Sequence, residues 1–132
     1  MEPGRDAHIV VAAVALVRDG RVLTVRKRGT ERFMLVGGKL EPGESARDAA
    51  LRETLEEVGI AVDEATLIGE FHSEAANEPG HTLHSTVFWI ESDAEPVAAG
   101  EIAEVRWTPL EDHPDDLAPM LEHHVLPVLR NR

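Results

Sequence analysis

Three glutamates near the middle of the chain, Glu53, Glu56 and Glu57, are the side chains best placed to do chemistry. On an α-helix they fall within one arc of roughly 100°, because each residue advances the helix by about 100°. Carboxylates at this spacing repel one another, and the negative end of the helix dipole adds to the repulsion. A hard divalent cation would turn that repulsion into coordination, since Mg²⁺ prefers oxygen ligands. A solvated acidic face is the alternative explanation for the three side chains.

The overall charge narrows the classes of ligand. The chain has 132 residues, with 13 Lys and Arg against 25 Asp and Glu, so its formal net charge is −12. Such a surface repels phosphate backbones and anionic lipids, which argues against a nucleic-acid polymer or a membrane as partner. A small anionic ligand would need a divalent cation between itself and the protein. Cysteine is absent, which excludes disulfide frameworks, thiolate nucleophiles and Cys-ligated zinc.

The glutamates are expected to lie on a helix with clear end signals. We predict this helix over Ala46–Val58, with Ser45 as its N-cap and Gly59 as the residue that ends it. The face opposite the glutamates is expected to pack into the core, and it carries Leu51, Thr54, Leu55 and Val58.

Around this helix the pattern predicts one α/β (α+β) domain over residues 1–132, with a mixed sheet flanked by helices. Asp19-Gly20 is typical of a tight hairpin turn, and Gly37-Gly38 is expected to form a loop after a short strand. The last helix is predicted over Leu117–Arg130, with a late start because of Pro119 and a kink or an early end because of Pro127. Strands are expected over His8–Val17, Val22–Arg28, Phe33–Val36, Ala65–His72, Thr82–Glu91 and Ile102–Thr108.

The beginning of the chain carries no recognisable export signal. Met1 to Ala7 has no cationic segment of the kind that opens a signal peptide, and the apolar run from Ile9 to Val17 is too short to span a bilayer. Together with the absence of cysteine, this predicts a cytoplasmic location.

The segment from Gly38 to Ile60 reads GKLEPGESARDAALRETLEEVGI. It resembles the Nudix box, Gly-x5-Glu-x7-Arg-Glu-U-x-Glu-Glu-x-Gly-U, in which U is a bulky aliphatic residue. All seven fixed residues are present. Thr54 stands at the first U position and is expected to be tolerated in the core, because it is β-branched and of similar width. Val36 stands where many MutT-type members have Pro. The resemblance implies an α/β/α sandwich.

The resemblance implies hydrolysis of a nucleoside diphosphate linked to another moiety, assisted by Mg²⁺ or Mn²⁺. The short chain favours a MutT-type nucleoside triphosphate pyrophosphohydrolase, acting on a nucleotide-like small molecule. Dimers are common in the family, so a homodimer is an expected assembly. A non-catalytic nucleotide-binding or sensor module on the same fold is the alternative function, although such a module has no reason to retain three mutually repelling carboxylates.

The roles implied for the residues of the box follow from this resemblance. Glu53, Glu56 and Glu57 are expected to bind the metal, with the carbonyl oxygen of Gly38 as a further ligand. Arg52 and Glu44 are expected to form a charge-assisted pair that locks the loop against the helix and orients a catalytic glutamate. A surface ion pair of little energetic value is the alternative for that pair.

The general base has two candidates outside the box, Glu101 and Glu104, with an ordinary solvated charge as the alternative for each, and Glu53 inside the box is the third candidate. Lys39, Arg26 and Arg28 are candidate contacts to phosphate, with a solvated cation as the alternative for each. Phe33 is a candidate to stack on a base, with a place in the core as the alternative. Residues with weaker patterns are read as structural: His72, His81 and His84 as polar strand residues rather than metal ligands, and Phe88 and Trp89 as neighbours on opposite faces of a strand.

Overall fold

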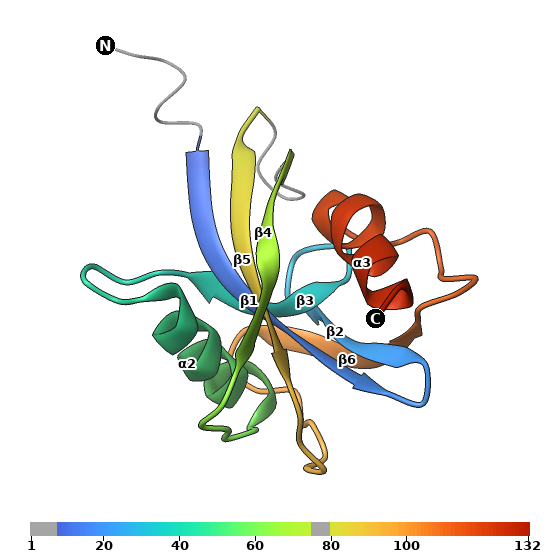
Figure 1. The fold of residues 1–132 in the computed structure, drawn as a ribbon, viewed down its shortest axis with the longest axis horizontal. Helices are drawn as coiled ribbons and strands as arrows, with labels where there is room; N and C mark the ends of the chain where they lie inside the picture. The colour runs from blue at the N-terminus through green and yellow to red at the C-terminus, as the bar shows by residue number, and fades with distance from the viewer. Residues whose placement is uncertain (1–7, 75–79) are drawn as a thin grey trace.

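Six strands form one mixed sheet in the computed structural model, which describes residues 8–74 and 80–132 (Figure 1). The order across the sheet is β4-β5-β1-β3-β2-β6, with β1 parallel to β5 and every other neighbouring pair antiparallel. The expected mixed sheet is confirmed, whereas the prediction for Met1 to Ala7 lies outside the described residues. The strands are β1 His8–Arg18, β2 Arg21–Lys27, β3 Met34–Lys39, β4 Thr66–Glu74, β5 Thr82–Ile90 and β6 Ile102–Pro109.

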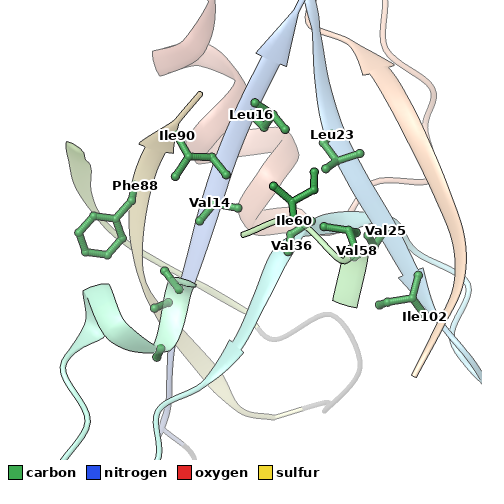
Figure 2. Packing of buried hydrophobic residues seen from close by; sticks show 13 residues of the cluster. Val14, Leu16, Leu23, Val25, Val36, Val58, Ile60, Phe88, Ile90 and Ile102 are labelled. Carbon is green, nitrogen blue, oxygen red and sulfur yellow. The ribbon is translucent and has the colours of Figure 1, made fainter. Parts of the chain in front are cut away.

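Helices cover both faces of the sheet, which gives the three layers that the sequence predicted (Figure 1). Helix α2, Ala46–Val58, packs on one face over a core of buried aliphatic side chains from β1, β2, β3 and β5 (Figure 2). The other face is covered by the π-helical segment η1, Met120–Val125, and by the short helix α3, Leu126–Arg130. Phe88 belongs to the first core and Trp89 packs against the second, so these neighbours lie on opposite faces as expected.

Two dipeptides that contain glycine, Asp19-Gly20 and Gly37-Gly38, lie in different kinds of structure. Asp19 and Gly20 have φ angles of 50° and 75° and join β1 to β2, which confirms the tight hairpin. Gly37 and Gly38 were expected in a loop, but they lie inside β3, so that prediction is wrong. At residue 37 a Cβ would lie 2.3 Å from the carbonyl oxygen of Ala12, so the glycine is required by the close approach of β1 rather than by a turn.

Helix α2 has the predicted bounds because both of its end signals are satisfied. The Ser45 hydroxyl accepts a hydrogen bond from the Asp48 N–H at 3.1 Å. Gly59 has a φ of 71°, and its N–H donates to the carbonyl of Leu55. Thr54 is fully buried, as expected, and its hydroxyl donates to the carbonyl of Ala50 at 2.7 Å.

One side chain of α2 points away from the core that was predicted for it. Leu55 is 55% exposed, whereas Glu57 is only 5% exposed. The buried arc of the helix is centred near Ala50 and Thr54, which brings Glu57 rather than Leu55 against the sheet.

The C-terminal helix begins later than Leu117, as the position of Pro119 predicted, but it is not one regular helix. Leu117 forms a parallel bridge with Phe33, and helical structure starts only at Met120. Pro127 lies in the first turn of α3, because its ring nitrogen cannot donate a hydrogen bond to the preceding turn. None of the helices in residues 8–74 and 80–132 is long and apolar enough to cross a membrane.

Candidate active site

A cavity of about 950 Å³ opens beside α2 and the end of β3. Its charged side chains come mainly from β2, β3 and α2 and from the segment before β6, and its apolar side chains come mainly from β1, β3, β5 and η1. An apolar surface next to charged groups suits a ligand that has both an apolar and an anionic part. The charged lining residues are Lys27, Arg28, Lys39, Glu41, Arg52, Glu53, Glu56, Glu74 and Glu101.

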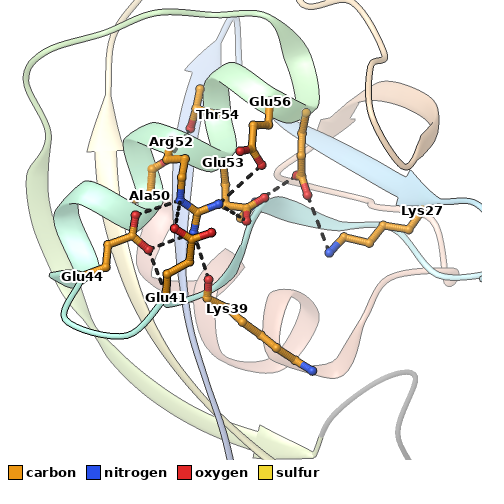
Figure 3. Close-up of polar contacts among 11 residues, drawn as sticks. Lys27, Lys39, Glu41, Glu44, Ala50, Arg52, Glu53, Thr54 and Glu56 are labelled. Carbon is orange, nitrogen blue, oxygen red and sulfur yellow. Dashed lines mark hydrogen bonds and ion pairs between the residues drawn. The ribbon is translucent and has the colours of Figure 1, made fainter.

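Arg52 is the centre of the polar contacts at this cavity (Figure 3). Its guanidinium donates to both carboxylate oxygens of Glu44, at 2.8 and 2.9 Å, and to Glu53 at 2.8 Å. It also donates to the carbonyl of Lys39 at 3.1 Å, so the loop after β3 is tied to the helix. The hydrogen bonds from Arg52 to Glu44 lower the pKa of the Glu44 carboxyl from 4.5 to about 2. The predicted pair of Arg52 and Glu44 is therefore present, with the two-point geometry of a strong ion pair.

Glu56 is more loosely held than its neighbour. Its carboxylate lies 3.4 Å from Arg52, and the side chain is 58% exposed, against 15% for Glu53. Both side chains line the cavity. A ligand in the cavity can therefore reach Glu56 without first breaking a strong ion pair.

Glu57 is the buried carboxylate of the site. Its side chain is 7% exposed, one oxygen accepts from the Gly37 N–H at 3.2 Å, and the other lies 3.6 Å from Nζ of Lys27. Burial raises its pKa to about 7, although Lys27 and the Gly37 N–H oppose the shift, and the neighbouring Glu53 adds to it. Glu57 does not itself line the cavity but lies next to Glu53, which does. Glu53 and Glu57 are thus two acids in contact, with Arg52 beside the first and Lys27 beside the second.

Lys27 is a site residue that the sequence analysis missed. It continues the alternation of Leu23 and Val25, two residues of β2 that are buried under α2. Extending that alternation by one step would have placed Lys27 on the helix-facing side of the sheet, toward Glu57.

The carboxylates of α2 suit a hard divalent cation, though they are not arranged as a finished cage. Residues 8–74 and 80–132 contain no group of three or more acidic or histidine side chains that already converge on one cation position. Arg52 holds Glu53 and Lys27 holds Glu57 in the present arrangement. The donor set still fits such an ion, because clustered carboxylate and carbonyl oxygens are its preferred ligands and two of the acids are in contact. The roles of these residues as metal ligands stay predictions.

The three candidates for the general base have different surroundings. Glu53 is bound to Arg52, and Glu104 is paired with Arg26 at 2.8 Å and does not line the cavity. Glu101 lines the cavity, and within the described part of the chain its carboxylate has no hydrogen-bond or ion-pair partner. Of the three, Glu101 is the one that lines the cavity with a carboxylate not paired within the described part of the chain.

Of the four candidate substrate contacts, Lys39 and Arg28 line the cavity, whereas Arg26 and Phe33 do not. Arg26 is bound to Glu104 and to the carbonyl of Thr30. Phe33 is 4% exposed in the core next to η1, with the guanidinium of Arg106 stacked 3.6 Å from its ring centre. The structure therefore does not place Arg26 or Phe33 at the cavity.

The histidines of the β4–β5 hairpin are not part of this cavity. His72 and His84 are cross-strand partners with ring centres 4.3 Å apart, and Glu70 contacts His84 at 2.8 Å. This is the strand setting expected for them, and no metal cluster involving them is found among the residues described.

Comparison with known proteins places the chain in one family over most of its length. The model of the NUDIX domain matches residues 6–129. The oxidized purine nucleoside triphosphate hydrolase of Danio rerio is 30% identical over 121 residues, covering 76% of this chain and 78% of the relative. The CTP pyrophosphohydrolase of Escherichia coli is 37% identical over 81 residues, covering 58% and 57%. The chain spans between 50% and 78% of the length of the first curated relatives that it matches.

A solved structure agrees with this placement. The MutT NUDIX hydrolase from Burkholderia pseudomallei is 29% identical, with a TM-score of 0.75, and the match covers 93% of this chain and 96% of that one. The resemblance seen in the segment from Gly38 to Ile60 is confirmed by these matches. The chain therefore belongs to the NUDIX domain family, the Nudix hydrolases.

Proposed function

We propose that the protein hydrolyses a phosphoanhydride bond of a nucleoside triphosphate with the help of Mg²⁺ or Mn²⁺. The observation that carries the proposal is the meeting of Glu53 and Glu56 with Lys39 at one cavity that also has an apolar surface. Two relatives named for different nucleosides, an oxidised purine and cytidine, share the triphosphate. We therefore propose the triphosphate as the recognised part of the substrate. The experiment below determines which base the substrate carries.

The metal would be held by Glu53, Glu56 and Glu57 and by the carbonyl oxygen of Gly38. When bound, it would neutralise phosphate charge and make water more nucleophilic. Arg52 keeps Glu53 in place through the hydrogen bond at 2.8 Å. Its hydrogen bond to the carbonyl of Lys39 holds the end of β3 against the helix. Lys39 is then positioned beside the cavity, where its charge favours an anionic ligand.

Glu101 is proposed as the general base, since its carboxylate lines the cavity without another partner among the described residues. It would accept a proton from the attacking water while the water oxygen bonds to phosphorus. The bridging P–O bond breaks, and the leaving phosphate oxygen keeps the electron pair. A cytoplasmic location, a homodimer and the lack of binding to nucleic-acid polymers stay predictions.

The proposal is tested with a panel of nucleoside triphosphates, dinucleoside polyphosphates and nucleotide sugars, each with Mg²⁺ or Mn²⁺. Product analysis by ³¹P NMR in ¹⁸O-water identifies the phosphorus that is attacked. We expect turnover of at least one nucleoside triphosphate, lost on chelation and restored by the metal. Binding without turnover across the panel would instead favour a nucleotide-binding module.

A further inference from the structure

The segment before β6 is bound to the C-terminal end of α2 by its backbone. We call this segment, Val97 to Glu101, the strap. The Val97 N–H donates to the carbonyl of Val58 and the Ala99 N–H to the carbonyl of Glu57, both at 3.0 Å. The last carbonyls of a helix lack partners within the helix, so the strap satisfies two of them. Its attachment points lie at the carboxylate-bearing end of α2.

The strap passes close to the helix at one further point. Gly100 has a φ of 57°, and a Cβ at this residue would lie 3.4 Å from the carbonyl oxygen of Glu56. A glycine accommodates this backbone turn without strain. The turn is directly followed by Glu101, whose side chain lines the cavity.

The far end of the strap is held by one residue of the loop after β2. The Arg28 N–H donates to the carbonyl of Glu101 at 2.9 Å, and its guanidinium Nη1 donates to the carbonyl of Gly100 at 2.8 Å. Arg28 thus binds the carbonyls on both sides of the Cα of Glu101. The strap is anchored to α2 at its first part and to Arg28 at its last, with Glu101 next to the second anchor.

We infer that Arg28 is a positioning residue that holds Glu101 at the reacting water, and this inference rests on the proposed function. Losing the guanidinium frees the Gly100 carbonyl, so the carboxylate of Glu101 samples more positions and accepts the proton less often. Arg28 also lines the cavity, and direct contact with a substrate phosphate is the competing role. A phosphate contact would act on substrate binding, whereas positioning acts on the rate of the bound complex.

A double-mutant cycle with R28M, E101Q and R28M/E101Q separates these roles. We expect E101Q to lower kcat by at least about 100-fold. We expect R28M to lower kcat by about tenfold with KM within about twofold, the size of effect of one lost hydrogen bond. The double variant should be no slower than E101Q, because positioning matters only while Glu101 is present. The control R47M loses a similar bond, from Arg47 Nη2 to the carbonyl of Asp63 at 2.7 Å, away from the cavity, and should keep its kcat.

Three kinetic results would overturn the inference: a raised KM with unchanged kcat in R28M, fully additive losses in the double variant, or full activity of E101Q. Hydrogen exchange tests the anchor without any substrate. In R28M the amides of Val97 and Ala99 should exchange faster, while the amides of β1 stay protected. Unchanged exchange in the strap would refute the anchoring role. A wild-type chain without turnover would refute the proposed function instead, and the exchange result would still decide whether Arg28 anchors the strap.

Discussion

Gly38 lies so close to the carboxylate of Glu53 that a Cβ at residue 38 would be 2.6 Å from the carboxyl carbon. Strand β3 and helix α2 therefore meet at a point where one partner has no side chain. The same contact brings the carbonyl-bearing backbone of Gly38 next to one of the acids proposed to bind the metal. The first glycine of the family motif is explained here by a steric requirement of α2 rather than by a loop.

The substitution G38A is expected to lower activity much more than stability. The atoms that a new Cβ meets are the far end of the flexible Glu53 side chain, which can swing away at little energetic cost. The swing would take Glu53 out of the proposed metal site and lower kcat/KM by at least about tenfold. Steady-state kinetics and thermal unfolding of the same samples measure both effects.

The matched comparison is G37A, one residue earlier on the same strand. There the new Cβ would meet the backbone of Ala12 at 2.3 Å, and backbone cannot move aside cheaply. G37A should therefore unfold at a lower temperature than G38A does. A G38A protein that keeps full activity would show that the position of Glu53 is not needed for the reaction.

E56Q is expected to lower the turnover rate by about 100-fold or more while the free energy of unfolding changes by less than about 0.5 kcal/mol. The side chain is 58% exposed and its contact with Arg52 is long, so removing its charge costs the fold little. Kinetics in saturating Mg²⁺ and denaturant unfolding give the two numbers. E64Q, at an exposed acid outside the cavity, is the control and should match the wild type in both.

Low pH should weaken the anchor between the loop and α2. Arg52 lowers the pKa of Glu44 to about 2, below its usual value of 4.5. A lowered folded-state pKa stabilises the fold above the unfolded-state pKa, and the contribution is lost as the pH falls from about 4.5 to 2. E44Q should thus be less stable than the wild type at pH 7, and the difference should shrink as the pH approaches 2. Urea unfolding of both proteins from pH 7 to pH 2 measures that difference, and a constant gap would contradict the prediction.

The sequence could predict those parts of the fold that depend on local patterns, namely the residues that end a helix and the alternation of apolar and polar residues in a strand. The bounds of α2 follow from Ser45 and Gly59, because a cap and a left-handed glycine act on the helix alone. The loop predicted at Gly37 and Gly38 was wrong, because glycine is typical of loops. Only the packing of β3 against β1 and α2 explains why these two glycines lie in a strand.

The candidate site was predictable where residues lie close in sequence and not where they come from distant segments. Arg52 and Glu44 were paired correctly because the motif carries both. The contact between Lys27 and Glu57 joins a strand to a helix, and the sheet order that creates it cannot be read from spacing. For the same reason the sequence could not decide between base stacking and a place in the core for Phe33, since Arg106, which covers its ring, is far away in the sequence.

T54V tests the one departure from the aliphatic pattern of the motif. Thr54 is fully buried, and its hydroxyl donates to the carbonyl of Ala50, which a helix already satisfies by its own backbone. Valine keeps the shape and removes the polar group, so the free energy of unfolding should stay the same or rise by up to about 1 kcal/mol. T54S, which loses a methyl group in the core, should be less stable by about 1 kcal/mol. A large loss of stability in T54V would mean that the hydroxyl is needed for the fold.

E57Q tests the buried member of the proposed metal site through stability rather than catalysis. Without metal, glutamine removes a charge from a side chain that is only 7% exposed and can still accept from the Gly37 N–H, so stability should be equal or higher. Metal that binds only the folded wild type at 100 times its Kd adds about 2.7 kcal/mol of stability. E57Q should lose most of that gain, whereas E104Q, outside the cavity, should keep it. Thermal unfolding with and without Mg²⁺ or Mn²⁺ measures the gain, and an equal gain in E57Q would remove Glu57 from the ligand set.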